Sequence, residues 1–127
     1  MIAVDTSALM AIVLDDERSQ ACRAALTAEE RILISAGTLV ELSIVSLRRR
    51  VNDDIALLID ELPLDVIPVT RETAQRIYSI YAHWGKGMHP AALNLGDCFA
   101  YDVATQHDCA LLYVGDDFSK TDVKSVL

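Results

Sequence analysis

The chain has 127 residues, of which 52% are hydrophobic and 24% charged, and its net charge is −8. This length and composition predict one domain, 1–127, with a buried core, and exclude a disordered protein. The acidic balance argues against a binding module with a broad basic face. It remains compatible with a nucleic-acid enzyme whose negative charge is concentrated in a metal-loaded cleft.

The chain offers no segment for a membrane. Its longest wholly apolar run, 8–14, is too short to span a bilayer, and Met1 leads directly into an apolar stretch without the positive region of a signal peptide. Cys22, Cys98 and Cys109 form an odd set without metal-ligand spacing. We expect them to be buried thiols, and we expect a protein of the reducing cytoplasm.

In the first half of the chain the apolar pattern alternates between strand and helix. The expected elements are a strand over 2–5, a helix capped by Thr6 or Ser7, a second helix from 15–16 to about 28, a strand over 31–35 and a helix that runs to about 51. On the last of these helices Val40, Ile44, Leu47 and Val51 recur at helical spacing as an apolar stripe.

The second half continues the alternation. It predicts a short helix opened by Asp53 and Asp54, a strand over 64–68, a helix from Thr70 to 85–87, a loop to 96, a helix over 97–107, a strand over 110–114 and a short last strand within 122–127. Strands separated by helices pair in parallel. The fold class is therefore α/β, a three-layer α/β/α sandwich with a mainly parallel central sheet.

The helix after Thr70 carries a stripe of large apolar residues, namely Ile77, Ile80, Tyr81 and Trp84. This stripe exceeds what a small sheet needs to cover one face, and aromatic residues favour interfaces. We expect a homodimer through this helix. The alternative is that the stripe belongs to the internal core.

Acidic residues stand where expected strands end or helices begin, at Asp5, Glu41, Asp97 and the pair Asp116–Asp117. Each has a structural explanation of its own. Asp5 suits a helix cap, and Glu41 follows Thr38 at the spacing of a capping box. Asp97 lies in a first helical turn, where negative charge is favoured, and the pair at 116–117 fits an ordinary turn.

Taken together, these acids predict a metal site. The carboxyl ends of parallel strands share one edge of a sheet, where such folds bind ligands. Two carboxylates ~4 Å apart repel by roughly 4 kcal/mol at an effective dielectric of 20, and a divalent cation relieves that repulsion. Oxygen ligands suit Mg²⁺ or Mn²⁺, and the combination is that of a phosphodiesterase in which neighbouring carboxylates orient and deprotonate a water molecule.

Three segments resemble the VapC toxin subfamily of PIN domains: IAVDTSAL at 2–9, GKGMHPAALNLGDC at 85–98 and LLYVGDDF at 111–118. Order and spacing match over essentially the whole chain. The resemblance implies a Mg²⁺-dependent endoribonuclease, with Mn²⁺ able to substitute. It also implies an RNA substrate and a cognate VapB-type antitoxin, the partner in a toxin–antitoxin pair.

The resemblance also assigns roles to residues. It implies that Asp5 and Asp97 are the principal metal ligands and that Glu41 completes the acidic cluster. The fourth family acid is Asp116 or Asp117, of which Asp116 is favoured because it is nearer to the strand end. Thr6 and Ser7 match hydroxyl positions that orient the first aspartate or a substrate phosphate.

Other classes of protein share some of these features. A phosphoreceiver-like Mg²⁺-binding signalling domain has similar length, but the third strand here is followed by 68–70, Pro-Val-Thr, with no phosphoacceptor aspartate. A phosphatase of the haloacid-dehalogenase type needs a second aspartate where Ser7 stands. A metal-independent ribonuclease would use His83, His89 or His107, none of which has an obvious positioned partner.

Overall fold

Four parallel strands form one sheet in the computed structural model, which describes residues 1–127. The strands are β1 (Ile2–Val4), β2 (Ile32–Ser35), β3 (Leu64–Ile67) and β4 (Leu111–Leu112), in the spatial order β3-β2-β1-β4. Ala3 in the central strand β1 lies opposite Leu33 on one side and Leu111 on the other. All carboxyl ends therefore point to the same edge, as the alternation of strands and helices predicts.

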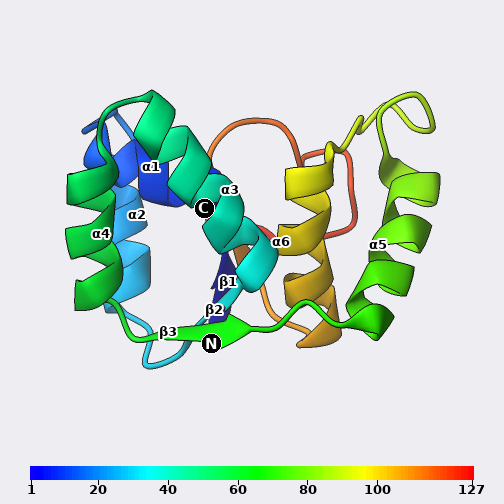
Figure 1. The fold of residues 1–127 in the computed structure, drawn as a ribbon, viewed down its shortest axis with the longest axis horizontal. Helices are drawn as coiled ribbons and strands as arrows, with labels where there is room; N and C mark the ends of the chain where they lie inside the picture. The colour runs from blue at the N-terminus through cyan, green and yellow to red at the C-terminus, as the bar shows by residue number, and fades with distance from the viewer.

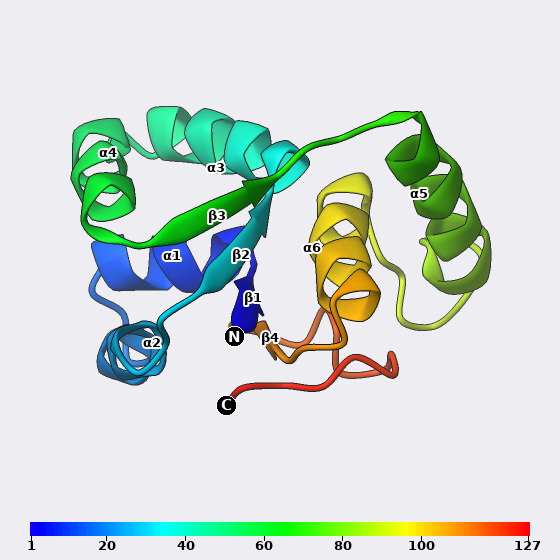
Figure 2. The ribbon, with the colours of Figure 1, turned by 90° about the horizontal axis from the view of Figure 1, so that it is seen from below.

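Six helices cover the two faces of this sheet (Figures 1 and 2). They are α1 (Thr6–Val13), α2 (Ser19–Thr27), α3 (Ala36–Arg48), α4 (Asn52–Glu61), α5 (Arg71–Trp84) and α6 (Leu95–Gln106). The helices α1 to α4 lie on one face, and α5 and α6 lie on the other. The predicted three-layer α/β/α sandwich is confirmed.

Each face of the sheet has its own core. Ile2 and Val4 of β1 pack with α1, α2 and α4, whereas Ala3 between them packs with α6. Successive side chains of a strand point to opposite faces, so a short, wholly apolar strand serves both cores. This explains why the strands read as continuous apolar runs.

The carboxyl-terminal part differs from the predicted boundaries. Helix α6 begins at Leu95 and is capped by Asn94, two residues before the expected start at Asp97. Strand β4 has two residues, and the tail adds a single bridge between Leu111 and Ser125 instead of a strand. The early start of α6 makes Asp97 the third residue of the helix, in its first turn, where its side chain can reach back to the cap.

Helix α3 buries a different face from the one its apolar stripe indicates. Ser35 caps the helix and Thr38 is buried inside it, so Thr38 and Glu41 do not form the capping box that is the structural alternative for Glu41. The stripe of Val40, Ile44 and Leu47 faces outward, with exposed fractions of 61%, 50% and 65%. The face that packs inward is formed by Thr38, Leu42 and Ser46.

The apolar stripe on α5 packs internally. Ile77 is buried, and Ile80, Tyr81 and Trp84 pack against the core that α6 shares. The indole Nε1 of Trp84 also donates a hydrogen bond to the Tyr101 hydroxyl on α6, at 3.1 Å. The stripe therefore covers α6, which is the alternative that the sequence left open, and it gives no support to a dimer through this helix.

No helix combines the length and apolarity that a bilayer crossing requires. All three cysteines are free, with Cys22 and Cys98 buried and Cys109 half-buried, close to the expected burial.

Candidate active site

Asp5 lies directly after β1 and caps α1. Its Oδ2 accepts hydrogen bonds from the backbone N–H of Ser7 at 3.1 Å and from the Ser7 hydroxyl at 2.6 Å. Its Oδ1 is buried and has no hydrogen-bond partner, although the side chain is only 4% exposed. A buried carboxylate oxygen is costly when left unpaired, so Oδ1 is the atom that a cation would satisfy.

Glu41 reaches this edge from the second turn of α3. The Thr6 hydroxyl donates a hydrogen bond of 2.6 Å to Glu41 Oε1. Thr6 precedes Ser7 in α1, so the two adjacent hydroxyls hold two different carboxylates. Ser7 thus orients the first aspartate, which is one of the two tasks that the resemblance implies for these hydroxyls, whereas Thr6 binds Glu41 instead.

Asp97 is held at the start of α6 by a reciprocal cap. The Asn94 backbone N–H donates to Asp97 Oδ2 at 3.0 Å, and the Asp97 N–H donates to Asn94 Oδ1 at 2.8 Å. The side chain is 7% exposed. Asp97 therefore has a capping role together with its position in the acidic cluster. The role of Asn94 was missed, although the Asn-x-x-Asp spacing at 94–97 is a capping signal.

Of the two carboxyl-terminal aspartates, Asp117 acts on the cluster. Gly115 adopts φ +100°, a left-handed conformation that suits glycine, and turns the chain after β4. The Asp116 carbonyl then accepts hydrogen bonds from Ser119, while the negative charge of Asp117 contributes to the raised pKa of Asp97. On electrostatic grounds Asp117 is therefore the candidate fourth acid, whereas the sequence favoured Asp116.

The cluster is electrostatically unfavourable without a cation. Burial raises the pKa of Asp97 to about 7, and the charges of Asp117, Asp5 and Glu41 add to the rise. Burial also raises the pKa of Asp5 to about 6, against the opposing hydrogen bonds from Ser7 and with a further rise from Glu41. Perturbed acids that face one another in this way mark functional sites.

The donor set fits a hard cation. All the candidate ligands are carboxylate oxygens, which Mg²⁺ and Mn²⁺ prefer. No three acidic, histidine or cysteine side chains converge tightly enough to enclose an ion by themselves. Mg²⁺ does not require such a cage, because it keeps several waters and is commonly held by one or two carboxylates. The unpaired Oδ1 of Asp5 would be the anchor for such an ion.

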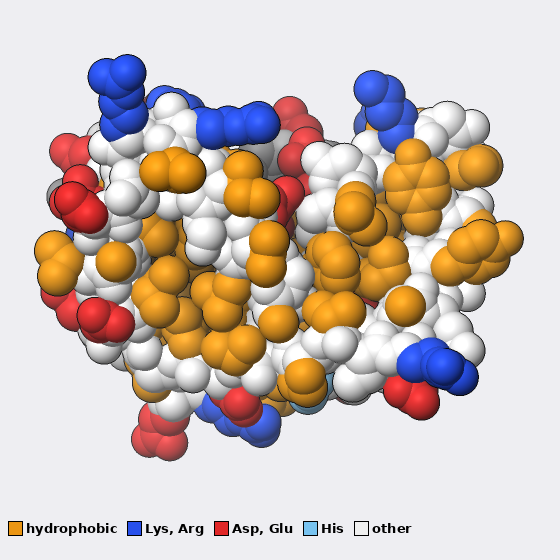
Figure 3. All heavy atoms as spheres, in the orientation of Figure 1, with side chains coloured by type: hydrophobic (Ala, Val, Ile, Leu, Met, Phe, Trp, Pro, Cys, Tyr) orange, Lys and Arg blue, Asp and Glu red, His pale blue; other side chains and the backbone are white.

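An apolar groove of about 340 Å³ adjoins Glu41. It runs between α3 and α6 and is lined by Gly37, Val40, Glu41, Ile44, Val45, Leu95, Gly96 and Phe99. Figure 3 shows hydrophobic side chains gathered over this face, with acidic side chains beside them. The outward stripe of α3 forms one wall.

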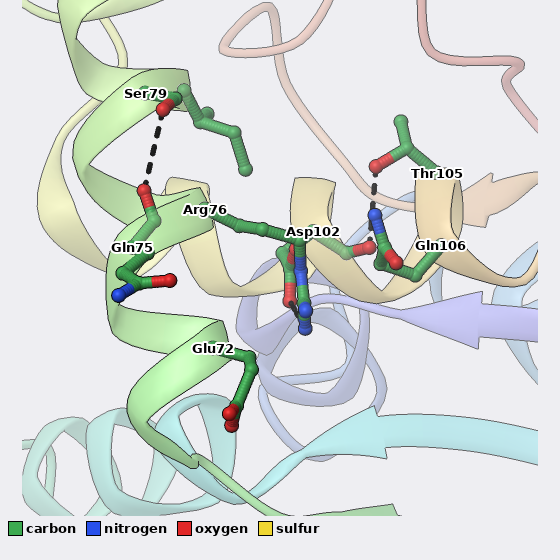
Figure 4. A pocket seen from close by; sticks show the side chains of 8 residues that line it. Glu72, Gln75, Arg76, Ser79, Asp102, Thr105 and Gln106 are labelled. Atoms are coloured by element: carbon green, nitrogen blue, oxygen red, sulfur yellow. Dashed lines mark hydrogen bonds and ion pairs between the residues drawn. The ribbon is translucent and has the colours of Figure 1, made fainter.

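A second, polar pocket of about 370 Å³ lies between α5 and α6 (Figure 4). Arg76 extends from α5 to Asp102 on α6, and its Nε and Nη2 bind the two carboxylate oxygens at 2.6 and 3.1 Å. Asp102 is buried but neutralised by this pair. The pocket contains none of the clustered acids. We assign a structural role to the Arg76–Asp102 ion pair, which joins α5 to α6.

Comparisons with known proteins identify the family of the chain. The family model of the PIN domain matches residues 2–124. Ribonuclease VapC28 of Mycobacterium tuberculosis is 37% identical over 128 residues, which cover 98% of this chain and 96% of that protein. Ribonuclease VapC30 of the same species is 32% identical over 129 residues, which cover 98% of each. The chain belongs to the PIN domain family, and within it to the VapC ribonucleases.

Solved structures share the fold. VapC20 of Mycobacterium tuberculosis, described as a sarcin-ricin loop cleaving toxin, superposes with a TM-score of 0.80 over 99% of this chain and 98% of that one, at 18% identity. A toxin–antitoxin complex from Klebsiella pneumoniae gives a TM-score of 0.70 over 96% and 93%, also at 18% identity.

Proposed function

We propose that the protein is a Mg²⁺-dependent endoribonuclease, the toxin of a VapBC-type pair, and that it acts in the cytoplasm. The observation that carries the proposal is the acidic cluster at the carboxyl edge of the sheet, where Asp5 Oδ1 is buried and unpaired. Relatives at 32% and 37% identity that are named ribonucleases support this activity. Membership of the PIN family leaves no support for the phosphoreceiver alternative.

Each acid has a distinct task in this proposal. Asp5 and Asp97 would hold the ion, since they are the two most deeply buried of the acids. Glu41 is half-buried and held through only one oxygen by Thr6, which leaves Oε2 to accept a proton from an attacking water. Asp117, which is exposed, completes the negative site from the turn after β4. A bound Mg²⁺ lowers the pKa of water and stabilises charge on the phosphate.

The reaction type is tested by the ends of the products. Water attack on the phosphodiester leaves a 5′-phosphate and a 3′-hydroxyl, because the 2′-hydroxyl takes no part. Purified protein should cleave structured RNA with Mg²⁺ or Mn²⁺ and lose activity in EDTA. Cleavage that survives EDTA, or products with 2′,3′-cyclic phosphates, would refute the metal mechanism.

We also propose the groove between α3 and α6 as the docking site of a VapB-type antitoxin. An exposed apolar stripe lies on α3, at Val40, Ile44 and Leu47. Glu41 of the acidic cluster is among the residues that line the groove. An apolar segment followed by an Arg or Lys fits both features, because the cation would replace the metal charge. Solved toxin–antitoxin complexes with this fold support such a partner.

A homodimer remains a separate hypothesis without a surface assigned to it, since the α5 stripe is internal. Light scattering of the protein alone at micromolar concentration tests it, and a monomer there would contradict it.

A further inference from the structure

Two glycines lie where α3 and α6 cross. A Cβ added to Gly37 of α3 would lie 2.6 Å from ring atoms of Phe99, which comes from α6. A Cβ added to Gly96 of α6 would lie 1.8 Å from Oε2 of Glu41, which comes from α3. Each helix therefore places one side chain over the glycine of the other. The contact at Gly96 involves a residue of the acidic cluster.

Space, rather than backbone conformation, requires glycine at position 96. Gly96 lies in the first turn of α6, and its φ is outside the positive range adopted by Gly87 and Gly115. Alanine would fit the helical backbone there, and it is the better helix former by about 1 kcal/mol in a helix interior. The three atoms nearest to an alanine methyl would all belong to the carboxylate of Glu41.

Glu41 is fixed from two sides. The Thr6 hydroxyl holds Oε1 at 2.6 Å, and Oε2 rests against the bare Cα of Gly96. The next residue along α6 is Asp97, so a carboxylate that rests on Gly96 lies beside Asp97. The missing side chain at position 96 therefore sets how closely Glu41 approaches Asp97.

We propose that Gly96 is a positioning residue for the acidic site, because it seats the Glu41 carboxylate beside Asp97. This inference rests on the proposed nuclease function. A methyl group at position 96 displaces the carboxylate, which is the free end of a flexible side chain, and leaves the helix intact. Gly96→Ala is thus a change in the site with little cost in folding.

The test is a double-mutant cycle of Gly96→Ala and Glu41→Ala. It measures Mn²⁺ affinity by calorimetry, RNA cleavage as separate kcat and KM values, and melting temperature in EDTA. Gly96→Ala should weaken Mn²⁺ binding or lower kcat by about tenfold or more, the scale of supporting-residue mutations at metal sites. The KM for RNA should be unchanged, and the melting temperature in EDTA should be unchanged or raised.

In the Glu41→Ala background, Gly96→Ala should have no further effect, because no carboxylate remains to be displaced. The double variant Gly96→Ala with Glu41→Asp should recover part of the loss, since a shorter side chain clears the methyl group. Gln106→Ala, an exposed position near the other end of α6, serves as the control for a change in helix propensity and should match wild type.

The proposal would be overturned if Gly96→Ala lowered Mn²⁺ affinity or kcat by the same factor with and without Glu41. It would also be overturned if the Gly96→Ala protein had wild-type metal binding and kcat. Wild-type protein that neither binds Mn²⁺ nor cuts RNA would instead refute the proposed function. In that case a crystal structure of Gly96→Ala decides the positioning claim, which requires the Glu41 carboxylate to have moved.

Discussion

Ser7 connects the first aspartate to the last strand of the sheet. Its hydroxyl donates to Asp5 Oδ2 at 2.6 Å and accepts the backbone N–H of Val114 at 3.0 Å. One side chain thus fixes the orientation of the proposed metal ligand and satisfies a donor that follows β4. The sequence predicts a hydroxyl next to Asp5, but not this second contact, because Val114 is 107 positions away along the chain.

Ser7→Ala should therefore reduce both stability and metal binding. Leaving a part-buried N–H without a partner costs about 1–3 kcal/mol, and a looser Asp5 should bind Mn²⁺ more weakly. Urea unfolding in EDTA and a Mn²⁺ titration measure the two effects, with Ser7→Thr as the control that retains the hydroxyl. An alanine variant as stable and as tight-binding as wild type would show that the contact is incidental.

Asp97 shows that one residue can serve as a cap and as a site residue. In the folded state its pKa is about 7, against the ordinary aspartate value of 3.8. At about 1.4 kcal/mol per pKa unit, ionised Asp97 opposes folding by an amount on the order of a few kcal/mol. That exceeds the ~0.3–1 kcal/mol gained from a negative charge at a helix start.

Asp97→Asn should accordingly melt at a higher temperature than wild type in EDTA at pH 8. Asparagine retains an oxygen for the Asn94 N–H and caps about as well as aspartate. The advantage should shrink as pH falls and disappear below about pH 4, where Asp97 is protonated in both the folded and the unfolded state. Mg²⁺ should stabilise wild type far more than the variant, and RNA cleavage should fall to background. A variant that is less stable at pH 8 and still cuts RNA would reduce Asp97 to a cap.

At the scale of elements, the sequence predicted the order and type of strands and helices well, because their apolar periods are clear. The apolar stripe of α3, however, does not mark the face of the helix that is buried. Val40, Ile44 and Leu47 form the more hydrophobic stripe, yet Thr38 and Ser46 are the buried residues. Small side chains lie inward because α3 packs closely on α1 and α6, and such close packing cannot be read from periodicity alone.

The exposed stripe should matter for partner binding and not for folding. Ile44→Lys should change the free energy of unfolding by about 0.5 kcal/mol or less and leave RNA cleavage intact, while it abolishes binding of the cognate antitoxin. The buried Leu42→Ala on the same helix should cost about 2–5 kcal/mol. Urea unfolding and a pull-down with the co-expressed antitoxin measure these outcomes. An Ile44→Lys protein that still binds antitoxin normally would move the docking site elsewhere.

At the scale of the molecule, the parallel sheet explains why residues from 5 to 117 meet at one edge. The four acidic positions could be predicted from their places after strands and before helices, with the resemblance to a known family. The sequence could not decide between Asp116 and Asp117, because that choice depends on the turn that Gly115 makes. The contact of Glu41 with Gly96 could not be predicted from the sequence either, because it depends on how two helices cross.

The metal-free protein should become less stable as pH rises. The pKa values of Asp5 and Asp97 are raised from 3.8 to about 6 and about 7, so the folded state binds more protons than the unfolded state between these values. Stability in EDTA should fall from about pH 4 to about pH 7 and level off above. Melting curves of wild type and of Asp5→Asn with Asp97→Asn check this, and a steep fall that persists in the double variant would assign the effect to other groups.

The most direct test of the central claim is calorimetric titration of metal-free protein with Mn²⁺ at about pH 6.5, in two buffers of different ionisation enthalpy. We predict that Mn²⁺ binding releases protons, because the ion must displace them from acids with raised pKa values. We also predict that this binding is lost in Asp5→Asn. The absence of binding to wild type, or equal binding by Asp5→Asn without proton release, would contradict the claim that this cluster is a metal site.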